Sequence, residues 1–284
     1  MGKEVEIVSQ HKCFNGVQRF YKHESTATGL PMTFSVYEPP QAKTRKVPVL
    51  FYLAGLTCTE ETFMIKGGAQ RYAAEHGIML VSMDTSPRRT GIRGAAESWD
   101  FGHGAGFYID ATQQPWATHF RMESYVVQEL RGIIVANFPV LADRIGVFGH
   151  SMGGHGALTL ALKYPEIYKS VSAFAPITAP SLCPWGQKAF SNYLGNDTAA
   201  WAQHDASLLM RERKTPFPQG ILIDQGLEDE FLDIQLLPHQ FEAACWAADQ
   251  PLTLRRHAGY DHNYYFISTF MQDHVQWHAA ILNA

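Results

Sequence analysis

The residues best suited to chemistry belong to the pentapeptide GHSMG at positions 149–153. The short apolar run 144–148 precedes it, and a helical pattern follows as far as Tyr164. This order is typical of a strand–turn–helix in which a strained turn lifts a serine hydroxyl above the carboxyl end of a sheet. Ser151 is therefore the predicted nucleophile, and the amide of Met152 is predicted to face a developing oxyanion. The alternative is a glycine-rich turn that merely contains a serine.

A serine hydroxyl is barely ionised near neutral pH, so it needs a base and a group that orients this base. When the serine lies on such a turn, the acid and then the histidine follow it along the chain. Three acids, Glu228, Asp229 and Glu230, follow the apolar run 221–225. Spacing alone does not choose among them, and three consecutive acids are otherwise typical of a solvated surface turn.

The predicted base is His262, which lies in a loop just before the last amphipathic helix pattern. His257, at the end of the preceding strand pattern, is the nearby alternative, and His262 could instead cap the helix or satisfy a core hydrogen bond. We expect the serine turn to direct His150 away from the site. The remaining histidines form no metal-ligand motif such as H-E-x-x-H, so no metal is expected.

The second oxyanion donor is predicted to follow the apolar run 47–54. This assigns the amide of Leu56 to the site, unless Gly55 simply begins an ordinary strand-to-helix turn. Cys58 lies two residues further on, and we expect a thiol near the nucleophile that has no catalytic role.

The elements that must position these residues alternate between strand and helix. Apolar runs of strand length occur at 47–54, 78–84, 144–148, 171–175, 221–225 and 252–257, and helical patterns at 60–76, 122–138, 236–248 and the end of the chain. This alternation predicts an α/β fold with a mostly parallel central sheet flanked by helices, in a single domain over 1–284. Antiparallel edge strands are predicted at 5–15 and 18–24, and a clearer strand at 32–37. The irregular segment 85–118 is predicted to wall a small acyl pocket with aromatic residues that include Trp99 and Phe107.

Composition excludes several classes of protein. The sequence is 46% hydrophobic and 18% charged, with a formal net charge of −4, so we expect a large core and no nucleic-acid or anionic-membrane partner. No apolar run reaches the length of a membrane span, and the first six residues lack the apolar segment of a signal peptide. The four cysteines have no C-x-x-C spacing and are expected to be free thiols in a reducing cytoplasm.

Beyond these single motifs, the sequence resembles the S-formylglutathione hydrolase (esterase D) family over essentially its whole length. The matching segments are longer and more specific than G-x-S-x-G, and they comprise 53–60, 97–102, 104–108, 149–156, 183–186, 224–226 and 259–266. One departure is His103, which stands where the family usually has a smaller residue. We expect His103 to affect the shape of the substrate pocket.

The resemblance implies a cytoplasmic α/β-hydrolase, a homodimer, that converts S-formylglutathione to glutathione and formate through a formyl-enzyme without a cofactor. It aligns the catalytic acid with Asp229 and the base with His262, and it supports Leu56 and Met152 as oxyanion donors. It also places Trp185 and Lys188 in a loop near the substrate, where Trp99, Phe107 and Cys58 are the other candidate contacts. A broad short-chain carboxylesterase is the alternative enzyme, and a non-catalytic binding protein of the same fold is the alternative of another class.

Overall fold

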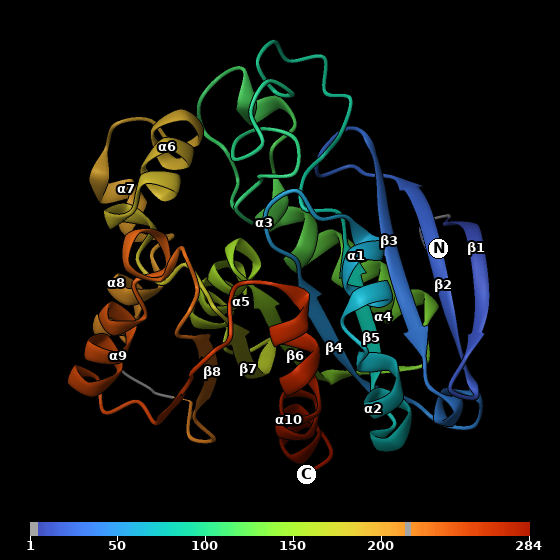
Figure 1. Ribbon diagram of the computed structural model, residues 1–284. Coiled ribbons are helices and arrows are strands. Elements are labelled where there is room, and N and C mark those ends of the chain that lie inside the picture. The colour runs from blue at the N-terminus through green and yellow to red at the C-terminus, as the bar shows by residue number, and fades with distance from the viewer. Residues whose placement is uncertain (1–4, 214–216) are drawn as a thin grey trace.

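The computed structural model describes residues 5–213 and 217–284. Residues 1–4, part of the amino-terminal segment that we expect to lack a signal peptide, lie outside this described part. Within it, one nine-stranded sheet has the order β1-β2-β3-β5-β4-β6-β7-β8-β9 (Figure 1). The sheet is antiparallel from β1 to β5 and parallel from β5 to β9. The predicted α/β fold with a mostly parallel sheet is confirmed.

The strands correspond closely to the apolar runs of the sequence. Their bounds are β1 (Glu6–Cys13), β2 (Gly16–Glu24), β3 (Pro31–Glu38), β4 (Val47–Leu53), β5 (Met79–Met83), β6 (Val140–His150), β7 (Tyr168–Phe174), β8 (Ile221–Gly226) and β9 (Leu252–His257). The chain runs from β4 to β5 on one side and then crosses to β6 on the other side of β4. Because the order reverses there, the loops after β4 and β6 diverge and leave a crevice at the carboxyl ends of these strands.

Helices cover both faces of the sheet. The longer ones are α1 (Glu60–Lys66), α2 (Ala69–His76), α4 (Arg131–Asn137), α5 (Met152–Lys163), α6 (Pro184–Tyr193), α8 (Ala206–Arg211), α9 (Pro238–Ala247) and α10 (Tyr264–Leu282). The shorter ones are α3 (Met122–Ser124), α7 (Thr198–Ala202), the π-helical turns Tyr125–Leu130 and Leu232–Leu236, and the 3₁₀ turns Pro40–Lys43, Trp116–Thr118 and Pro180–Leu182. In Figure 1, α2 and α10 lie together in front of the sheet and α4 and α5 lie behind it.

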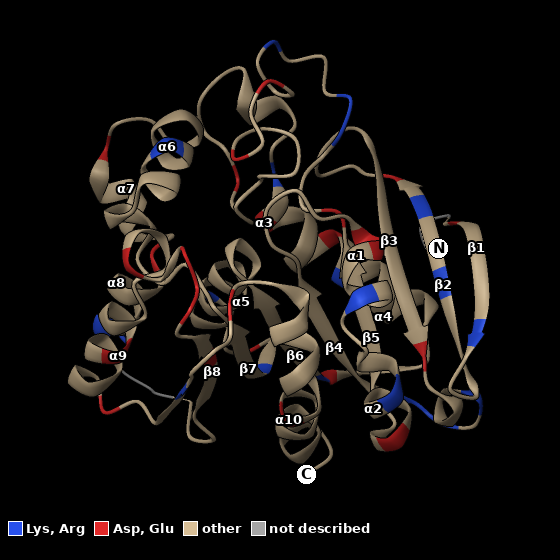
Figure 2. Ribbon diagram, viewed as in Figure 1, with Lys and Arg blue, Asp and Glu red and all other residues tan. Residues whose placement is uncertain are grey.

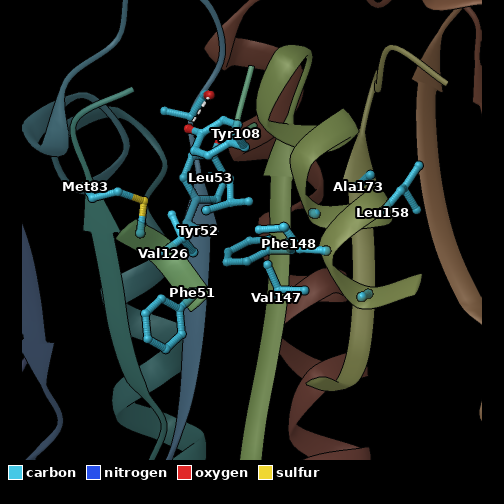
Figure 3. Packing of buried hydrophobic residues seen from close by; sticks show 14 of the residues in the cluster. Phe51, Tyr52, Leu53, Met83, Tyr108, Val126, Val147, Phe148, Leu158 and Ala173 are labelled. Atoms are coloured by element: carbon cyan, nitrogen blue, oxygen red, sulfur yellow. Dashed lines mark hydrogen bonds between the residues drawn. The ribbon is translucent and has the colours of Figure 1, made fainter. Parts of the chain in front are cut away.

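The core lies between these helices and the central strands. Every residue of β4 is buried, as expected for a strand that is covered on both faces. Tyr52 of β4 stacks on Phe63 of α1 with ring centroids 3.7 Å apart, and its ring meets the edge of Phe148 of β6 at 4.8 Å. Figure 3 shows residues of β4 and β6 packed side by side in this core. Burying such aromatic side chains contributes about 1.5–3 kcal/mol each, so the two strands that carry the crevice are firmly anchored.

Some expected elements differ in detail. The helix expected over 60–76 is two helices, because Gly68 adopts a left-handed φ of 68° that ends the first one. The helix expected over 122–138 contains the π-helical turn between α3 and α4. The loop-rich segment after β7 contains α6, which begins with Pro184 at its first position and with the Cys183 sulfur accepting a hydrogen bond from the amide of Gly186.

Figure 2 shows basic and acidic residues distributed along many elements of the chain. In the described part of the chain, no helix has the length and apolar character needed to span a membrane.

Candidate active site

Ser151 occupies a strained turn between β6 and α5. Its backbone has φ 57° and ψ −120°, a conformation that L-residues rarely adopt outside functional sites. Gly149 and Gly153, which flank Ser151, leave no room for a side chain. A Cβ atom on Gly153 would lie 1.9 Å from the carbonyl oxygen of Leu53, and one on Gly149 would lie 2.3 Å from the carbonyl oxygen of Gly153. The turn therefore has the strained strand–turn–helix geometry that the GHSMG pentapeptide predicts.

The two predicted oxyanion donors, the amides of Leu56 and Met152, lie in segments next to Ser151. Met152 is the first residue of α5, where a helix amide has no acceptor within its own helix. In the loop after β4, the amides of Thr57 and Cys58 donate to the carbonyls of Gly104 and Gly55, and Leu56 between them lines the cavity next to Ser151. The positive end of α5 and free amides at Leu56 and Met152 would suit a developing oxyanion.

Tyr108 anchors the loop that carries Leu56. Its hydroxyl donates a 2.8 Å hydrogen bond to the carbonyl oxygen of Ala54, the residue after β4, as Figure 3 shows. The Tyr108 side chain is 1% exposed, and burial raises its pKa well above the ordinary tyrosine value, so it remains a neutral donor. The loop geometry is thus fixed from a buried side chain of the segment 85–118.

Asp229 and His262 form a buried acid–imidazole pair. The Nδ1 of His262 lies 2.6 Å from Oδ2 of Asp229, whose side chain is 0% exposed. An ionised carboxylate only accepts hydrogen bonds, so Nδ1 carries the proton and Nε2 is left as the acceptor that a serine hydroxyl needs. The neighbours Glu228 and Glu230 are exposed. Burial thus separates Asp229 from the two acids that spacing could not exclude.

The loops that carry the acid and the base are joined to each other. The amide of Leu227 donates to the carbonyl of His257, and the amide of Glu228 donates to the carbonyl of Tyr260 at 2.9 Å. The amide of Phe231 donates to Oδ1 of Asp229 at 2.9 Å. Because these bonds lie within and between the loops after β8 and β9, the Asp229 carboxylate cannot rotate freely away from the imidazole.

These groups meet at one cavity of about 180 Å³. It is lined by Gly55, Leu56, Cys58, Trp99, His150, Ser151, Trp185, Phe231, His262, Asn263 and Tyr264. Ser151, His262 and the Leu56 loop therefore share one space, and Asp229 contacts His262 without lining it. The arrangement can carry out nucleophilic acyl transfer, because a nucleophile, an oriented base and oxyanion donors all converge on this space.

Comparison with known proteins places the chain in a family. A family model described as putative esterase matches residues 25–282. The chain is 53% identical to the S-formylglutathione hydrolase of Rattus norvegicus, with 99% of this chain and 100% of that one covered. It is 54% identical to the S-formylglutathione hydrolase of Paracoccus denitrificans, over 96% and 97% of the two chains. The solved S-formylglutathione hydrolase of Agrobacterium tumefaciens has a TM-score of 0.95 and 49% identity, with 98% and 99% covered. The chain belongs to the S-formylglutathione hydrolase family.

Within this family member, the predicted contacts Trp99, Trp185 and Cys58 do line the cavity. The rings of Trp99 and Trp185 meet edge to face at 5.5 Å, and Trp185 packs on Phe231 at 4.7 Å. Phe231 in turn meets the imidazole of His262 at 5.0 Å. Aromatic rings thus form a continuous wall from the mouth of the cavity to the base.

Lys188 does not line the cavity. Its Nζ lies 2.5 Å from Oδ1 of Asp100 and 3.0 Å from Oγ of Ser98. Burial disfavours ionised Asp100, but the hydrogen bonds from Lys188 and Ser98 outweigh this effect and lower the pKa of Asp100. Lys188 therefore fastens the loop that carries Trp99 to α6, and its contact with the substrate stays a prediction.

Two further expectations about the segment 85–118 are corrected. Phe107 is 0% exposed and packs on His155 and Phe190 in the core, so it does not wall the cavity. His103 lies within the loop, where its Nε2 is 3.2 Å from Oγ1 of Thr90, and it does not line the cavity either. Of this segment only Trp99 reaches the cavity, because the other aromatic residues turn inward to hold the long irregular chain together.

His150 was expected to point away from the site, and this expectation is wrong. Its ring lies 4.4 Å from the ring of His262 and lines the cavity. Burial lowers the pKa of His150 well below its ordinary value, and the neighbouring His262 lowers it further, so the ring is neutral. Sequence reasoning also missed Phe231, Asn263 and Tyr264 as cavity residues. Their proximity in sequence to Asp229 and His262 is the signal that could have found them.

Proposed function

We propose that this chain hydrolyses S-formylglutathione to glutathione and formate with Ser151, Asp229 and His262 as its catalytic triad. The observation that carries this proposal is the buried Asp229–His262 pair beside a strained serine turn, in a chain more than half identical to proteins named S-formylglutathione hydrolase. The cavity beside Ser151, of about 180 Å³ and lined by Trp99 and Trp185, offers a place for the thioester.

In this mechanism Oγ of Ser151 attacks the thioester carbonyl while Nε2 of His262 takes the hydroxyl proton. The oxyanion is held by the amides of Leu56 and Met152, and collapse of the tetrahedral intermediate breaks the C–S bond. The glutathione thiolate takes the proton back from His262. Water then attacks the formyl-enzyme with His262 again as base, and formate leaves as Ser151 regains its proton. Asp229 fixes the tautomer and stabilises the imidazolium throughout.

The test is kcat/KM for S-formylglutathione, S-acetylglutathione and p-nitrophenyl acetate on the same purified protein. A preference for the formyl thioester by several orders of magnitude supports the proposal. The Ser151→Ala variant should lose essentially all turnover and all fluorophosphonate labelling, on the order of a 10⁶-fold loss of kcat. Activity of this variant within about tenfold of wild type would refute the mechanism.

A second candidate is a broad short-chain carboxylesterase, which the match to a putative esterase model favours. Oxygen esters and thioesters pass through similar tetrahedral intermediates, so one triad serves both. Comparable kcat/KM on all three substrates would select this candidate and leave the triad in place. A non-catalytic protein that binds the thioester without hydrolysing it would fail to react with the fluorophosphonate.

We also propose a cytoplasmic homodimer. The four cysteines are all free thiols, which suits a reducing compartment. The edge strand β1 and the turn after it expose Ile7, Val8 and Phe14, an apolar area that a second copy could cover. Light scattering after size exclusion at micromolar concentration tests the dimer, and fractionation of cells that express the full chain tests the location.

A further inference from the structure

The strand that leads to the triad acid carries two buried polar residues side by side, Asp224 and Gln225. Successive side chains of a strand point to opposite faces of the sheet. On one face, Asp224 accepts hydrogen bonds from Arg255 of β9 and from His274 of α10. On the other face, Gln225 reaches Asp229. Its Nε2 lies 3.3 Å from Oδ2 of Asp229, the same oxygen that accepts from His262.

The orientation of the Gln225 amide is fixed by its surroundings. Nε2 also lies 3.0 Å from the carbonyl oxygen of Gly226, so two acceptors face this end of the amide. With the amide turned over, its oxygen would face both acceptors and be repelled by them. Gln225 is 0% exposed, and its side chain therefore presents a donor to the carboxylate without competition from water.

We propose that Gln225 is a positioning residue of the triad, which holds the Asp229 carboxylate so that Oδ2 stays in line with Nδ1 of His262. The amide of Phe231 holds Oδ1 from the other side at 2.9 Å. Without Gln225, the carboxylate would be held at one oxygen by Phe231 and at the other by the imidazole alone. Rotation of the carboxylate would then carry the imidazole out of line with Ser151. This inference rests on the proposed triad.

The first variant removes the donor and keeps the length of the side chain. Gln225→Met should lower kcat for S-formylglutathione by about 10- to 100-fold with KM changed less than about threefold, the loss expected for an ångström-scale displacement of a catalytic group. The rate of fluorophosphonate labelling should fall by the same factor, because it reports the reactivity of Ser151 directly.

The second variant makes the loss depend on pH. In Gln225→Glu, the introduced carboxyl can donate to Asp229 while it is protonated, but it repels Asp229 once it ionises. We expect this variant to stay within about threefold of wild-type kcat near pH 6 and to lose at least tenfold, relative to wild type at the same pH, by pH 9. A residue that only fills space would give a ratio that does not change with pH.

Gln250→Met is the matched control. Gln250 is also buried, and it bonds the backbone of Phe217 and Pro251, where the chain enters β8 and β9 at the ends opposite the site. The Gln250→Met variant should have a lower melting temperature, but its kcat should stay within about twofold of wild type at every pH. Asp229→Asn should lower kcat by on the order of 10⁴-fold.

The outcomes separate the two proposals. If the Gln225→Met protein is folded and its kcat stays within twofold of wild type while Asp229→Asn is inactive, the inference is overturned and the triad stands. A pH-independent loss in Gln225→Glu equal to that in Gln225→Met also overturns the inference, since it assigns Gln225 a packing role. If Asp229→Asn itself keeps wild-type activity, the assignment of the triad acid fails instead.

Discussion

Replacing Gly153 by alanine should damage catalysis through the backbone alone. The Cβ atom of the Gly153→Ala variant would lie 1.9 Å from the carbonyl oxygen of Leu53 and 2.5 Å from that of Ala54. Real Cβ contacts essentially never fall below 3.0 Å, so the start of α5 and the end of β4 must separate by roughly 1.1 Å. The first of these elements carries Ser151 and Met152, and the second leads to Leu56.

A displacement of about 1 Å between nucleophile and oxyanion donors costs on the order of 10²-fold in rate. The clash also strains a fully packed region, which typically costs about 1–3 kcal/mol of stability. We therefore expect kcat/KM for both S-formylglutathione and p-nitrophenyl acetate to fall by about 10²-fold or more in Gly153→Ala. The melting temperature should fall as well, while the far-UV circular dichroism at 25 °C stays native.

Gly132 provides the matched control, because it is also a helical glycine and a Cβ atom there meets nothing within 4 Å. Gly132→Ala should keep wild-type kinetics and gain up to about 1 kcal/mol of stability from the better helix propensity of alanine. Wild-type kcat/KM in folded Gly153→Ala would refute the argument that the close approach of β4 and α5 sets the geometry of the site.

Three other perturbations address the loops and the core. Lys188→Met should raise KM about two- to fivefold with little change in kcat, because Trp99 loses its tether. The melting temperature should change little, since partly exposed ion pairs contribute about 1 kcal/mol at most. Steady-state kinetics measure KM, and an unchanged KM in this variant would contradict the proposed tether. Tyr108→Phe removes the hydrogen bond to the carbonyl of Ala54. It should lower the free energy of unfolding, measured in urea, by about 1–3 kcal/mol and should also lower kcat measurably. A variant as stable as wild type would contradict this role of Tyr108. Burial lowers the pKa of His155 from 6.5 to about 3. Between pH 6.5 and about pH 3, the unfolded state therefore binds a proton on this imidazole that the folded state does not bind. The free energy of unfolding should fall as the pH drops below 6.5. Urea unfolding midpoints at pH 7.5, 6.5, 5.5 and 4.5 test whether stability falls with pH, and His155→Gln should make stability depend less steeply on pH.

The sequence predicted the sheet well because its signals are local and strong. Continuous apolar runs such as 47–53 leave few alternatives to a strand that is buried on both faces, and these runs became β4 to β9. It predicted the elbow for a similar reason, since only glycine fits where Gly149 and Gly153 approach the neighbouring backbone. The helices were predicted less accurately, because a π-helical turn or a break at Gly68 leaves the apolar periodicity almost unchanged.

The site was predicted less completely because its walls are made by contacts between distant segments. From the sequence, Lys188 and Phe107 are equally plausible candidates for contact with the substrate. Only the positions of Asp100 and Phe190 show that the first is tied to a loop and the second is packed in the core. Conversely, nothing in the local pattern of His150 indicates that its ring lies against that of His262.

The choice of Asp229 as the proposed triad acid shows where such tertiary information enters. Glu228, Asp229 and Glu230 are chemically similar and adjacent in sequence, and their order says nothing about which one turns inward. The bond from the amide of Glu228 to the carbonyl of Tyr260 fixes the loop so that the next side chain, that of Asp229, points into the protein. There it meets His262, the amide of Phe231 and Gln225. The pairing of two loops therefore turns Asp229, the proposed triad acid, inward. A change that breaks this pairing should lower kcat without touching any member of the proposed triad.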